Sequence, residues 1–358
     1  MAESVRASVK ATRWRAPAWF VKAAPLLLGV LLALSGLELV REHAFDPNNA
    51  GLGTLTRSVL GYGPGHRIQC EATAPGSPCV TDYRAAGSPP AVLWLGNSQL
   101  HGVNRYQPGQ STAPMLLHAA LAPKGLYLVA YSLPNANAQE YRAMFRQLTG
   151  QYAIRTIVVG VSLDKFREGG VRRAIEAGGP RAAPAGQTDD SLEAHSDAWL
   201  ERTLASNSGL WRDRGLIRSM VVYAIQVGHL RALGITSQTP RPVSPALLSE
   251  NMSALQGLIA DAGRNRTRVI LYAQPYRSDV PGPTPPGQYR RFLADLNAMA
   301  APGKVDVLDL TSLVPGPQWG MRKDPMFGFE DYDFMHFTAA GHRLLAQAIA
   351  PRFGVVVE

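Results

Sequence analysis

Short apolar runs alternate with helical stretches from residue 91 onwards, and this alternation constrains the fold more than any other feature of the chain. The runs predicted as strands are Ala91–Leu95, Leu126–Tyr131, Ile154–Val161, Val269–Ala273 and Val305–Leu310. The segments predicted as helices are 113–121, 138–148, 247–262, 289–299 and 338–353. Strands that alternate with helices form parallel sheets. We therefore expect an α/β fold, a three-layer α/β/α sandwich around a flavodoxin-like parallel five-stranded sheet.

The distribution of charge argues against a nucleic-acid partner. The 358-residue chain has a formal net charge of +9, but the first 22 residues hold five positive charges and one negative charge, or +4. These charged residues are Glu3, Arg6, Lys10, Arg13, Arg15 and Lys22. The other +5 is spread along the chain without a basic run interleaved with aromatic residues. We therefore expect no nucleic acid among the partners.

An apolar segment follows this basic cluster. Residues 23–40 carry no charge before Glu38 and are rich in Leu and Ala. Such a segment is either a signal peptide or a membrane anchor, with a buried core helix as the third alternative. The poor cleavage motif at 33–35 favours a retained single-pass transmembrane helix over 23–40. The positive-inside rule then leaves residues 1–22 in the cytoplasm and predicts a bacterial inner-membrane protein with a periplasmic domain.

The chain has two cysteines, Cys70 and Cys79, which enclose a Pro/Gly-rich loop. In an oxidising compartment such a pair is expected to form a disulfide, which agrees with export. His66 is the nearest histidine and no fourth ligand accompanies it, so a structural zinc site is disfavoured. We expect residues 41–90 to form a linker and coil between the membrane and a domain over 91–358.

A long insertion separates the third and fourth predicted strands. It covers about residues 169–246, which is too long for an ordinary connection, and we expect it to be mostly helical. Its first part, 169–196, is rich in Gly, Ala and Pro and is predicted to be an exposed loop. The strongly apolar stretch Leu216–Val227 is predicted to be a helix, which either packs on the core or forms a lid or a surface for lipid or a membrane partner.

Polar residues after the first predicted strand carry the main functional signal. The apolar run ends in Gly96-Asn97-Ser98, which predicts that Ser98 lies in a turn at the carboxyl edge of the sheet, where open α/β folds bind ligands. By itself this serine is either a helix cap or a nucleophile. Asp333 and His336 lie three residues apart in a predicted loop before the last helix. A carboxylate that orients a histidine, which deprotonates a serine, is the apparatus of serine-dependent acyl transfer.

These segments resemble the SGNH/GDSL hydrolase superfamily over about residues 90–353, without the insertion. Gly96-Asn97-Ser98 is similar to the first block of the family, Gly-Asp-Ser, and Asp333-Phe-Met-His336 matches its last block, Asp-x-x-His. The resemblance implies that Ser98 is the nucleophile, that His336 moves the proton and that Asp333 orients His336. It also implies an oxyanion hole made of the backbone N–H of Ser98 and of donors from two middle blocks.

The two middle blocks depart from the family pattern. In place of the glycine of the second block the chain has Ser132, whose backbone N–H is a substitute donor, with Asn135 or Asn137 as a side-chain donor. In place of Gly-x-Asn-Asp, residues 160–164 read Gly-Val-Ser-Leu-Asp. Loss of one oxyanion donor costs on the order of a hundredfold or more in rate, which implies a substitute donor or a slow or specialised enzyme. The candidate oxyanion and substrate residues are Ser132, Asn135, Asn137, Asp164 and Arg277.

Two other side chains lie near the predicted ligand edge. Arg277 follows the fourth strand in a Pro-rich loop and either binds an anionic or sugar substrate or is a solvated loop arginine. His101, three residues after Ser98, has no evident acidic partner, so we expect it to support the site rather than act as the base. Because the chain has neither a phosphate loop nor a dinucleotide fingerprint, we expect no cofactor, and we expect no metal.

The predicted anchor and the divergent middle blocks are similar to the membrane-anchored SGNH-like proteins that work beside membrane-bound O-acyltransferases. That resemblance implies a partner of this class and a role in alginate or peptidoglycan O-acetylation or in teichoic-acid D-alanylation. We therefore expect an exported serine acyltransferase or esterase that acts on O-acyl groups, acetyl above all, of a cell-envelope or secreted glycan. The alternatives are a non-catalytic scaffold that docks the O-acyltransferase and a secreted esterase or lipase.

Overall fold

The computed structural model of the chain describes residues 28–29, 32–39, 62–63, 66–70, 72–102, 110–176, 208–209, 225, 228–323 and 330–358. The chain divides into two units. One comprises Met1–Pro47 and Ser191–Ile217, and the other comprises Asn48–Asp190 and Arg218–Glu358. The second unit contains the sheet and the candidate site.

In the first unit, residues 32–39 are helical and the carboxylate of Glu38 accepts two hydrogen bonds. The donors are the backbone N–H of Gly209, at 2.9 Å, and the hydroxyl of Ser208, at 3.1 Å. Among the residues that the structure describes, no helix has both the length and the apolar character needed to cross a membrane. The rest of the predicted anchor and the basic segment 1–22 lie outside the described residues.

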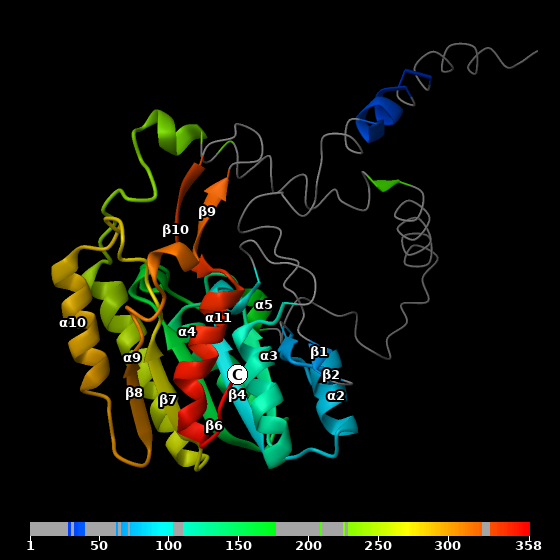
Figure 1. The fold of residues 1–358 in the computed structure, drawn as a ribbon, viewed down its shortest axis with the longest axis vertical. Helices are drawn as coiled ribbons and strands as arrows, with labels where there is room; N and C mark the ends of the chain where they lie inside the picture. The colour runs from blue at the N-terminus through cyan, green and yellow to red at the C-terminus, as the bar shows by residue number, and fades with distance from the viewer. Residues whose placement is uncertain are drawn as a thin grey trace, which may run out of the picture. The chain divides into compact units, whose positions relative to one another are not determined.

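The second unit is built on a parallel sheet of six strands (Figure 1). In spatial order the strands are β3 (Gln69–Cys70), β5 (Tyr127–Ser132), β4 (Ala91–Gly96), β6 (Ile154–Val161), β7 (Arg268–Ala273) and β8 (Val305–Asp309). The five predicted strands are all present, and β4 lies between β5 and β6. The chain therefore leaves β4 in one direction and later crosses to its other side, which makes the carboxyl end of β4 a switch point.

The prediction of five strands was wrong by one. The sixth strand, β3, pairs with β5 through Gln69 and Cys70 alone, opposite Ala130 and Tyr131. A strand of two residues gives no periodic signal, and its neighbours are the Gly- and Pro-rich residues that we expected to form coil. Part of the predicted linker is therefore an ordered edge of the sheet.

Helices cover both faces of the sheet (Figure 1). On one face lie α3 (Ala113–Leu121) and α11 (Ala339–Ile349), and on the other lie α2 (Pro78–Ala85), α4 (Ala138–Thr149), α9 (Pro245–Arg264) and α10 (Pro286–Asn297). Successive residues of a strand point to opposite faces. Val92 and Trp94 of β4 therefore belong to the hydrophobic core on the side of α3 and α11, and Leu93 and Leu95 belong to the core on the opposite side. This arrangement confirms the three-layer α/β/α sandwich.

Local sequence explains where these elements begin. Ile154–Val161 is rich in β-branched residues, which fit a buried strand. At the start of α9, the Ser244 hydroxyl accepts a hydrogen bond from the N–H of Leu247, and Pro245 occupies the first helical position.

The shorter elements are β1 (Tyr62–Gly63), β2 (His66–Arg67), η1 (Ser98–Leu100), η2 (Ala122–Lys124), η3 (Leu163–Arg167), α5 (Arg173–Glu176), η4 (Gly316–Gln318) and η5 (Ala350–Phe353).

A second, two-stranded sheet lies where we predicted a loop. It consists of β9 (Trp319–Lys323) and β10 (Glu330–Phe337), which pair in antiparallel orientation with each other and with no strand of the main sheet in the described part of the chain. Three of the first four residues of β10 are acidic, and Asp and Glu are depleted in strands, so the sequence did not indicate a strand here. The residues between the two strands lie outside the described ones.

Residues near the end of the predicted insertion form hydrogen bonds with this hairpin. The Ser237 N–H donates to the Asp331 carboxylate at 2.9 Å, and the Arg231 guanidinium donates to the Glu330 carbonyl at 3.1 Å. Residues 228–232 are helical, whereas most of the predicted loop 169–196 and of the apolar stretch 216–227 lies outside the described residues.

Cys70 and Cys79 form the predicted disulfide, with 6.2 Å between their Cα atoms. The bond joins the edge strand β3 to the first turn of α2. In the chain-entropy model, a cross-link over nine residues stabilises the native state by about 2–3 kcal/mol, because it restricts the unfolded chain.

We expect the double variant Cys70→Ala/Cys79→Ala to lose about 2–3 kcal/mol of unfolding free energy, measured by urea unfolding followed by circular dichroism. A reducing agent is expected to destabilise the wild type by a similar amount and to leave the double variant unchanged. Equal stability of the two proteins under oxidising conditions would contradict the prediction.

Candidate active site

Ser98 is the first residue of η1, directly beyond the end of β4. Asn97 caps this turn, since its side-chain oxygen accepts a hydrogen bond from the Gln99 N–H at 2.9 Å. Gly96 is required here, because a Cβ atom at this position would overlap the buried side chain of Leu100. The turn therefore holds Ser98, which is 7% exposed, at the carboxyl edge of the sheet.

The structure brings together Ser98, Asp333 and His336, which the sequence selected from opposite ends of the chain. The His336 Nε2 atom lies 2.9 Å from the Ser98 hydroxyl oxygen, and its Nδ1 atom lies 2.9 Å from Asp333 Oδ2. A carboxylate accepts, so Nδ1 carries the proton of the neutral ring. Nε2 is then the unprotonated nitrogen that can accept the Ser98 proton.

An irregularity in β10 makes this contact possible. Asp333 and His336 lie within a strand, where residues three apart would ordinarily point to opposite faces. The pairing of β10 with β9 shifts register between Tyr332 and Phe337, which interrupts the alternation across the two residues. The predicted loop was therefore wrong in type, although the predicted proximity of the carboxylate and the imidazole is observed.

The Asp333 carboxylate is fully buried and surrounded by donors. Besides the imidazole, its Oδ1 atom accepts the backbone N–H of Met335, at 2.9 Å, and that of His336, at 3.1 Å. A carboxylate with several donors is stabilised in its ionised form. This anion is therefore available to stabilise the positive charge of a protonated His336.

Ser132 ends β5 and lies opposite Gly96 of β4, beside the Ser98 turn. Its hydroxyl is 2.8 Å from His101 Nε2, which also lies 3.1 Å from the Ser132 carbonyl oxygen. Because a carbonyl only accepts, this nitrogen carries the proton of His101. His101 is thus bound to Ser132 and has no carboxylate partner in the described structure, as expected for a supporting residue.

A second buried histidine, His342, supports His101 from α11. Its Nε2–H donates to the His101 carbonyl at 3.2 Å, and its Nδ1 accepts the Ala113 N–H at 3.2 Å. Burial lowers the pKa of His101 to about 4 and that of His342 to about 3. Both rings are therefore neutral at neutral pH.

The two asparagines proposed as side-chain donors have other partners. Both polar ends of the Asn137 side chain serve the fold, since its oxygen caps α4 through the Glu140 N–H, at 3.0 Å, and its nitrogen donates to the Gly170 carbonyl, at 3.1 Å. Asn135 is exposed and adopts a left-handed backbone with φ of 58°. Its side-chain oxygen accepts from the Lys165 ammonium at 2.8 Å.

Asp164 lies in η3, just beyond β6, and forms ion pairs with Lys165 and Arg167. Burial by itself would raise the pKa of Asp164, but these two cations and Arg241 together hold it below its usual value. Asp164 also lines a small cavity whose walls include Met335, the residue before His336. The structure therefore places this ionised carboxylate near the site as part of a charge cluster.

Ser162 lies at the position where the Gly-x-Asn-Asp motif has an asparagine. It is buried just beyond β6, and its hydroxyl lies 4.0 Å from the Met335 sulfur. A hydroxyl at a sulfur atom makes a weak hydrogen bond. Ser162 therefore lies at the carboxyl edge of the sheet, and its hydroxyl makes a weak hydrogen bond to the Met335 sulfur.

Arg277 holds the β9–β10 hairpin. Its guanidinium binds Asp279 through Nε, at 2.8 Å, and Nη2, at 3.1 Å, and donates to the Gly320 carbonyl at 2.9 Å. It also stacks over the Tyr332 ring, 4.7 Å from the ring centre. These contacts engage the charge and one face of a 7% exposed side chain within the fold.

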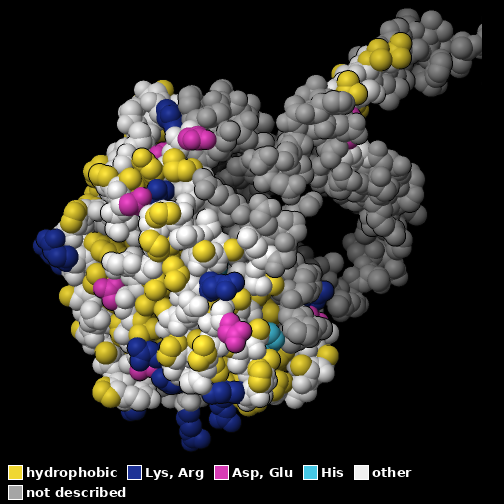
Figure 2. Space-filling view, viewed as in Figure 1, with side chains coloured by type: hydrophobic (Ala, Val, Ile, Leu, Met, Phe, Trp, Pro, Cys, Tyr) yellow, Lys and Arg dark blue, Asp and Glu magenta, His cyan; other side chains and the backbone are white. Residues whose placement is uncertain are grey.

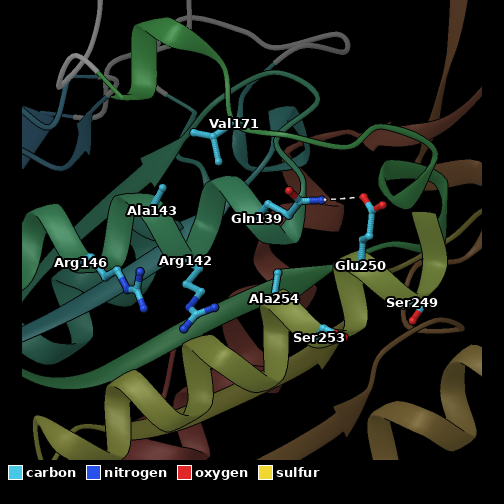
Figure 3. A pocket seen from close by; sticks show the side chains of 9 residues that line it. All are labelled: Gln139, Arg142, Ala143, Arg146, Val171, Ser249, Glu250, Ser253 and Ala254. Atoms are coloured by element: carbon cyan, nitrogen blue, oxygen red, sulfur yellow. Dashed lines mark hydrogen bonds between the residues drawn. The ribbon is translucent and has the colours of Figure 1, made fainter. Parts of the chain in front are cut away.

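A cavity outside the candidate site lies between α4 and α9 (Figure 3). It has a volume of about 550 Å³, and Arg142 and Arg146 project into it from α4. The Nε groups of both arginines donate to Asp261 of α9, at 2.9 and 2.8 Å. None of the predicted site residues lines this groove, and its ion pairs join the two helices.

Charge on the visible surface is dispersed. On the face shown in Figure 2, the described Lys and Arg side chains lie singly or in small groups among apolar and polar ones. The Asp333 carboxylate that contacts His336 is instead fully buried, and Asp164 and its cations are half-buried.

Comparison with known proteins gives weak likenesses. No family model and no curated protein matches the chain. A lipase/acylhydrolase from Enterococcus faecalis is 14% identical, with a TM-score of 0.36, over 75% of this chain and 98% of that one. An acetylxylan esterase from Geobacillus stearothermophilus is 11% identical, with a TM-score of 0.40, over 74% of this chain and 94% of that one. Such TM-scores are too low to establish a family or an activity.

Two residues of the site had no role assigned from the sequence. Gln99 is fully buried, and its side chain donates hydrogen bonds to the backbone of two distant segments. His342 lies on the buried side of α11, where positions 341, 342, 345 and 346 share one face. The helical period identifies that face, but the bond to His101 depends on tertiary packing.

The low pKa values of His101 and His342 predict acid sensitivity. Below pH 6.5 the unfolded chain takes up protons on these residues, whereas the native state does so only near pH 4 and pH 3. Unfolding free energy should therefore fall as pH drops from 7 to 5, by up to about 1.4 kcal/mol per pH unit for each histidine.

We expect His342→Asn to be less stable than the wild type at pH 7 but to lose stability more slowly between pH 7 and pH 5, measured by urea unfolding at each pH. Parallel plots of unfolding free energy against pH for the two proteins would show that His342 does not cause the acid sensitivity.

Proposed function

We propose that this chain is a serine-dependent acyl-transfer enzyme, an esterase or acyltransferase in which Ser98 is the nucleophile. The observation that carries the proposal is the line of hydrogen bonds from Ser98 through His336 to Asp333, with 2.9 Å at each step. A hydroxyl, an imidazole and a buried carboxylate in this order constitute the apparatus of acyl transfer.

In the first half of the reaction, His336 Nε2 takes the hydroxyl proton as the Ser98 oxygen attacks the acyl carbonyl. The resulting imidazolium is stabilised by Asp333, to which it still donates through Nδ1. Collapse of the tetrahedral intermediate breaks the ester bond, and His336 gives its proton to the departing alcohol. The acyl group then remains on Ser98.

In the second half, an incoming hydroxyl gives its proton to His336 and attacks the acyl-enzyme. Water yields an acid and makes the protein an esterase, whereas a glycan hydroxyl yields a new ester and makes it an acyltransferase. Exclusion of water decides between the two outcomes.

The oxyanion of the tetrahedral intermediate requires hydrogen-bond donors at the carboxyl edge of the main sheet. Ser98 begins η1, and the first N–H groups of a helix have no acceptor within it, which supports the Ser98 N–H as one donor. Ser132 lies on the adjacent strand end and is the second candidate. The engagement of Asn137 in capping supports a site with fewer donors and therefore a slower reaction.

For the substrate, we propose an O-acyl group, acetyl above all, on a cell-envelope or secreted glycan. The disulfide between Cys70 and Cys79 supports a location outside the cytoplasm, since such bonds persist in oxidising compartments. The order of basic and apolar residues in the first 40 positions supports a single-pass inner-membrane anchor with the domain in the periplasm. A membrane-bound O-acyltransferase as partner rests on the resemblance of the sequence.

A non-catalytic scaffold for such an acyltransferase is the second candidate. It is favoured by the use of Asn137 and Arg277 within the fold, which leaves the site without two of its expected polar groups. Polymer acylation in cells that carry Ser98→Ala discriminates the two, because the scaffold retains acylation and the enzyme loses it.

We expect a fluorophosphonate probe to label the wild-type protein at Ser98 and p-nitrophenyl acetate to be hydrolysed. Ser98→Ala should abolish labelling and reduce turnover at least a thousandfold, and Asp333→Asn should reduce it by about a thousandfold or more, because the imidazolium loses its counter-charge. The measurements are mass spectrometry of the labelled peptide and steady-state kinetics.

Ser77→Ala is the matched control, since Ser77 is a buried serine at the start of α2. This variant should be labelled as fast as the wild type. Unlabelled wild-type protein, or full turnover by Ser98→Ala, would overturn the proposed function.

A further inference from the structure

Gln99 follows the candidate nucleophile and is completely buried, with 0% of its surface exposed. Its side-chain nitrogen donates to two backbone carbonyls, those of Pro275, at 2.9 Å, and Met335, at 3.0 Å. Pro275 follows the end of β7, and Met335 lies on β10 between Asp333 and His336. One amide therefore links the Ser98 turn to two segments far away in the sequence.

The chemistry of the site fixes the orientation of this amide. Both neighbours are carbonyl oxygens, which only accept, so the NH₂ end must face them. Rotating the amide by 180° would place its oxygen against two other oxygens and leave both carbonyls without this donor, whereas in the observed orientation the Gln99 Oε1 atom alone lacks a partner among the described residues. Since a buried acceptor without a donor is unfavourable, the observed orientation of the amide is the more stable one.

The link matters because β10 does not belong to the main sheet. Its backbone pairs with β9, whereas Ser98 is carried by β4. The backbone ladder that fixes β4 against β5 and β6 therefore does not fix His336 against Ser98. The amide of Gln99 supplies a polar link between the two sheets that uses none of the reacting groups.

A second amide acts from the other side of Ser98. The Asn97 side-chain nitrogen donates to the Gln274 side-chain oxygen at 2.9 Å, which binds the turn to the end of β7. Both residues that flank Ser98 are therefore held from outside β4. Gln99 alone of the two reaches the strand that carries Asp333 and His336.

We propose that Gln99 is a positioning residue for acyl transfer: its amide holds the Met335 backbone, and hence the His336 imidazole, at proton-transfer distance from Ser98. The proposal rests on the proposed function. Displacement of catalytic groups by about 1 Å can cost on the order of a hundredfold in rate, so a bridge that fixes this distance has a kinetic effect beyond its contribution to stability.

The test replaces Gln99 with methionine, which has a similar length and shape but donates no hydrogen bond. Asn251→Leu is the matched control on α9. The Asn251 amide is equally buried and likewise donates to two backbone carbonyls, those of Glu168 and Leu247, both at 3.0 Å. Unfolding free energy, kcat and KM for p-nitrophenyl acetate, and the rate of fluorophosphonate labelling are measured for the full chain.

We expect both variants to lose stability, because each removes side-chain hydrogen bonds: two to backbone carbonyls in Gln99→Met, and two such bonds together with the one from the Ala138 N–H in Asn251→Leu. In Gln99→Met, kcat and the labelling rate should fall about 10- to 100-fold per folded molecule, with KM changed less than threefold. In Asn251→Leu, both rates should stay within twofold of the wild type. Gln99→Asn, which keeps the amide on a shorter side chain, should recover part of the lost rate.

Labelling of Gln99→Met at the wild-type rate would overturn the positioning role while leaving the proposed function intact. Equal losses of rate in Gln99→Met and Asn251→Leu would also overturn it, because buried amides would then act through stability alone. Absence of labelling in the wild type would instead refute the proposed function. If Gln99→Met does not fold, the kcat of Gln99→Asn decides the matter against the same control, with a loss of less than twofold overturning the role.

Discussion

The hydrogen bond between Ser98 and His336 spans two separately paired sheets, and the candidate site exists only where these sheets meet. The main parallel sheet fixes Ser98 through β4, and the small antiparallel hairpin fixes His336 through β10. No backbone ladder joins the two in the described structure. Side-chain contacts must therefore hold β10 in position relative to β4, which explains why polar residues around Ser98 are buried rather than solvated.

The buried charge of Asp333 imposes a second constraint. An ionised carboxylate inside a protein is tolerated when donors surround it, and here they are one imidazole and two backbone N–H groups. Those N–H groups are free for this purpose because β10 loses its regular pairing between Tyr332 and Phe337. The same irregularity thus positions the histidine and compensates the charge that orients it.

The sequence predicted the strands, the layers and the grouping of Ser98 with Asp333 and His336, because these depend on local periodicity and on a short motif. It did not predict β3 or the β9–β10 hairpin, whose pairing is decided by partners distant in the sequence. The sequence also did not predict the side-chain contacts of Asn137 and Arg277, because a residue that serves the fold and one that binds a substrate are the same residue type in a sequence. Only their neighbours, Glu140 and Asp279, distinguish them.

The two-residue strand β3 covers one edge of the main sheet. The outer edge of β5 has unpaired backbone groups that could recruit a strand from another chain, and β3 occupies that edge opposite Ala130 and Tyr131. A cover so short would separate readily, but the Cys70–Cys79 bond ties it to α2. Reduction of one covalent bond would therefore loosen the strand that covers the edge of β5.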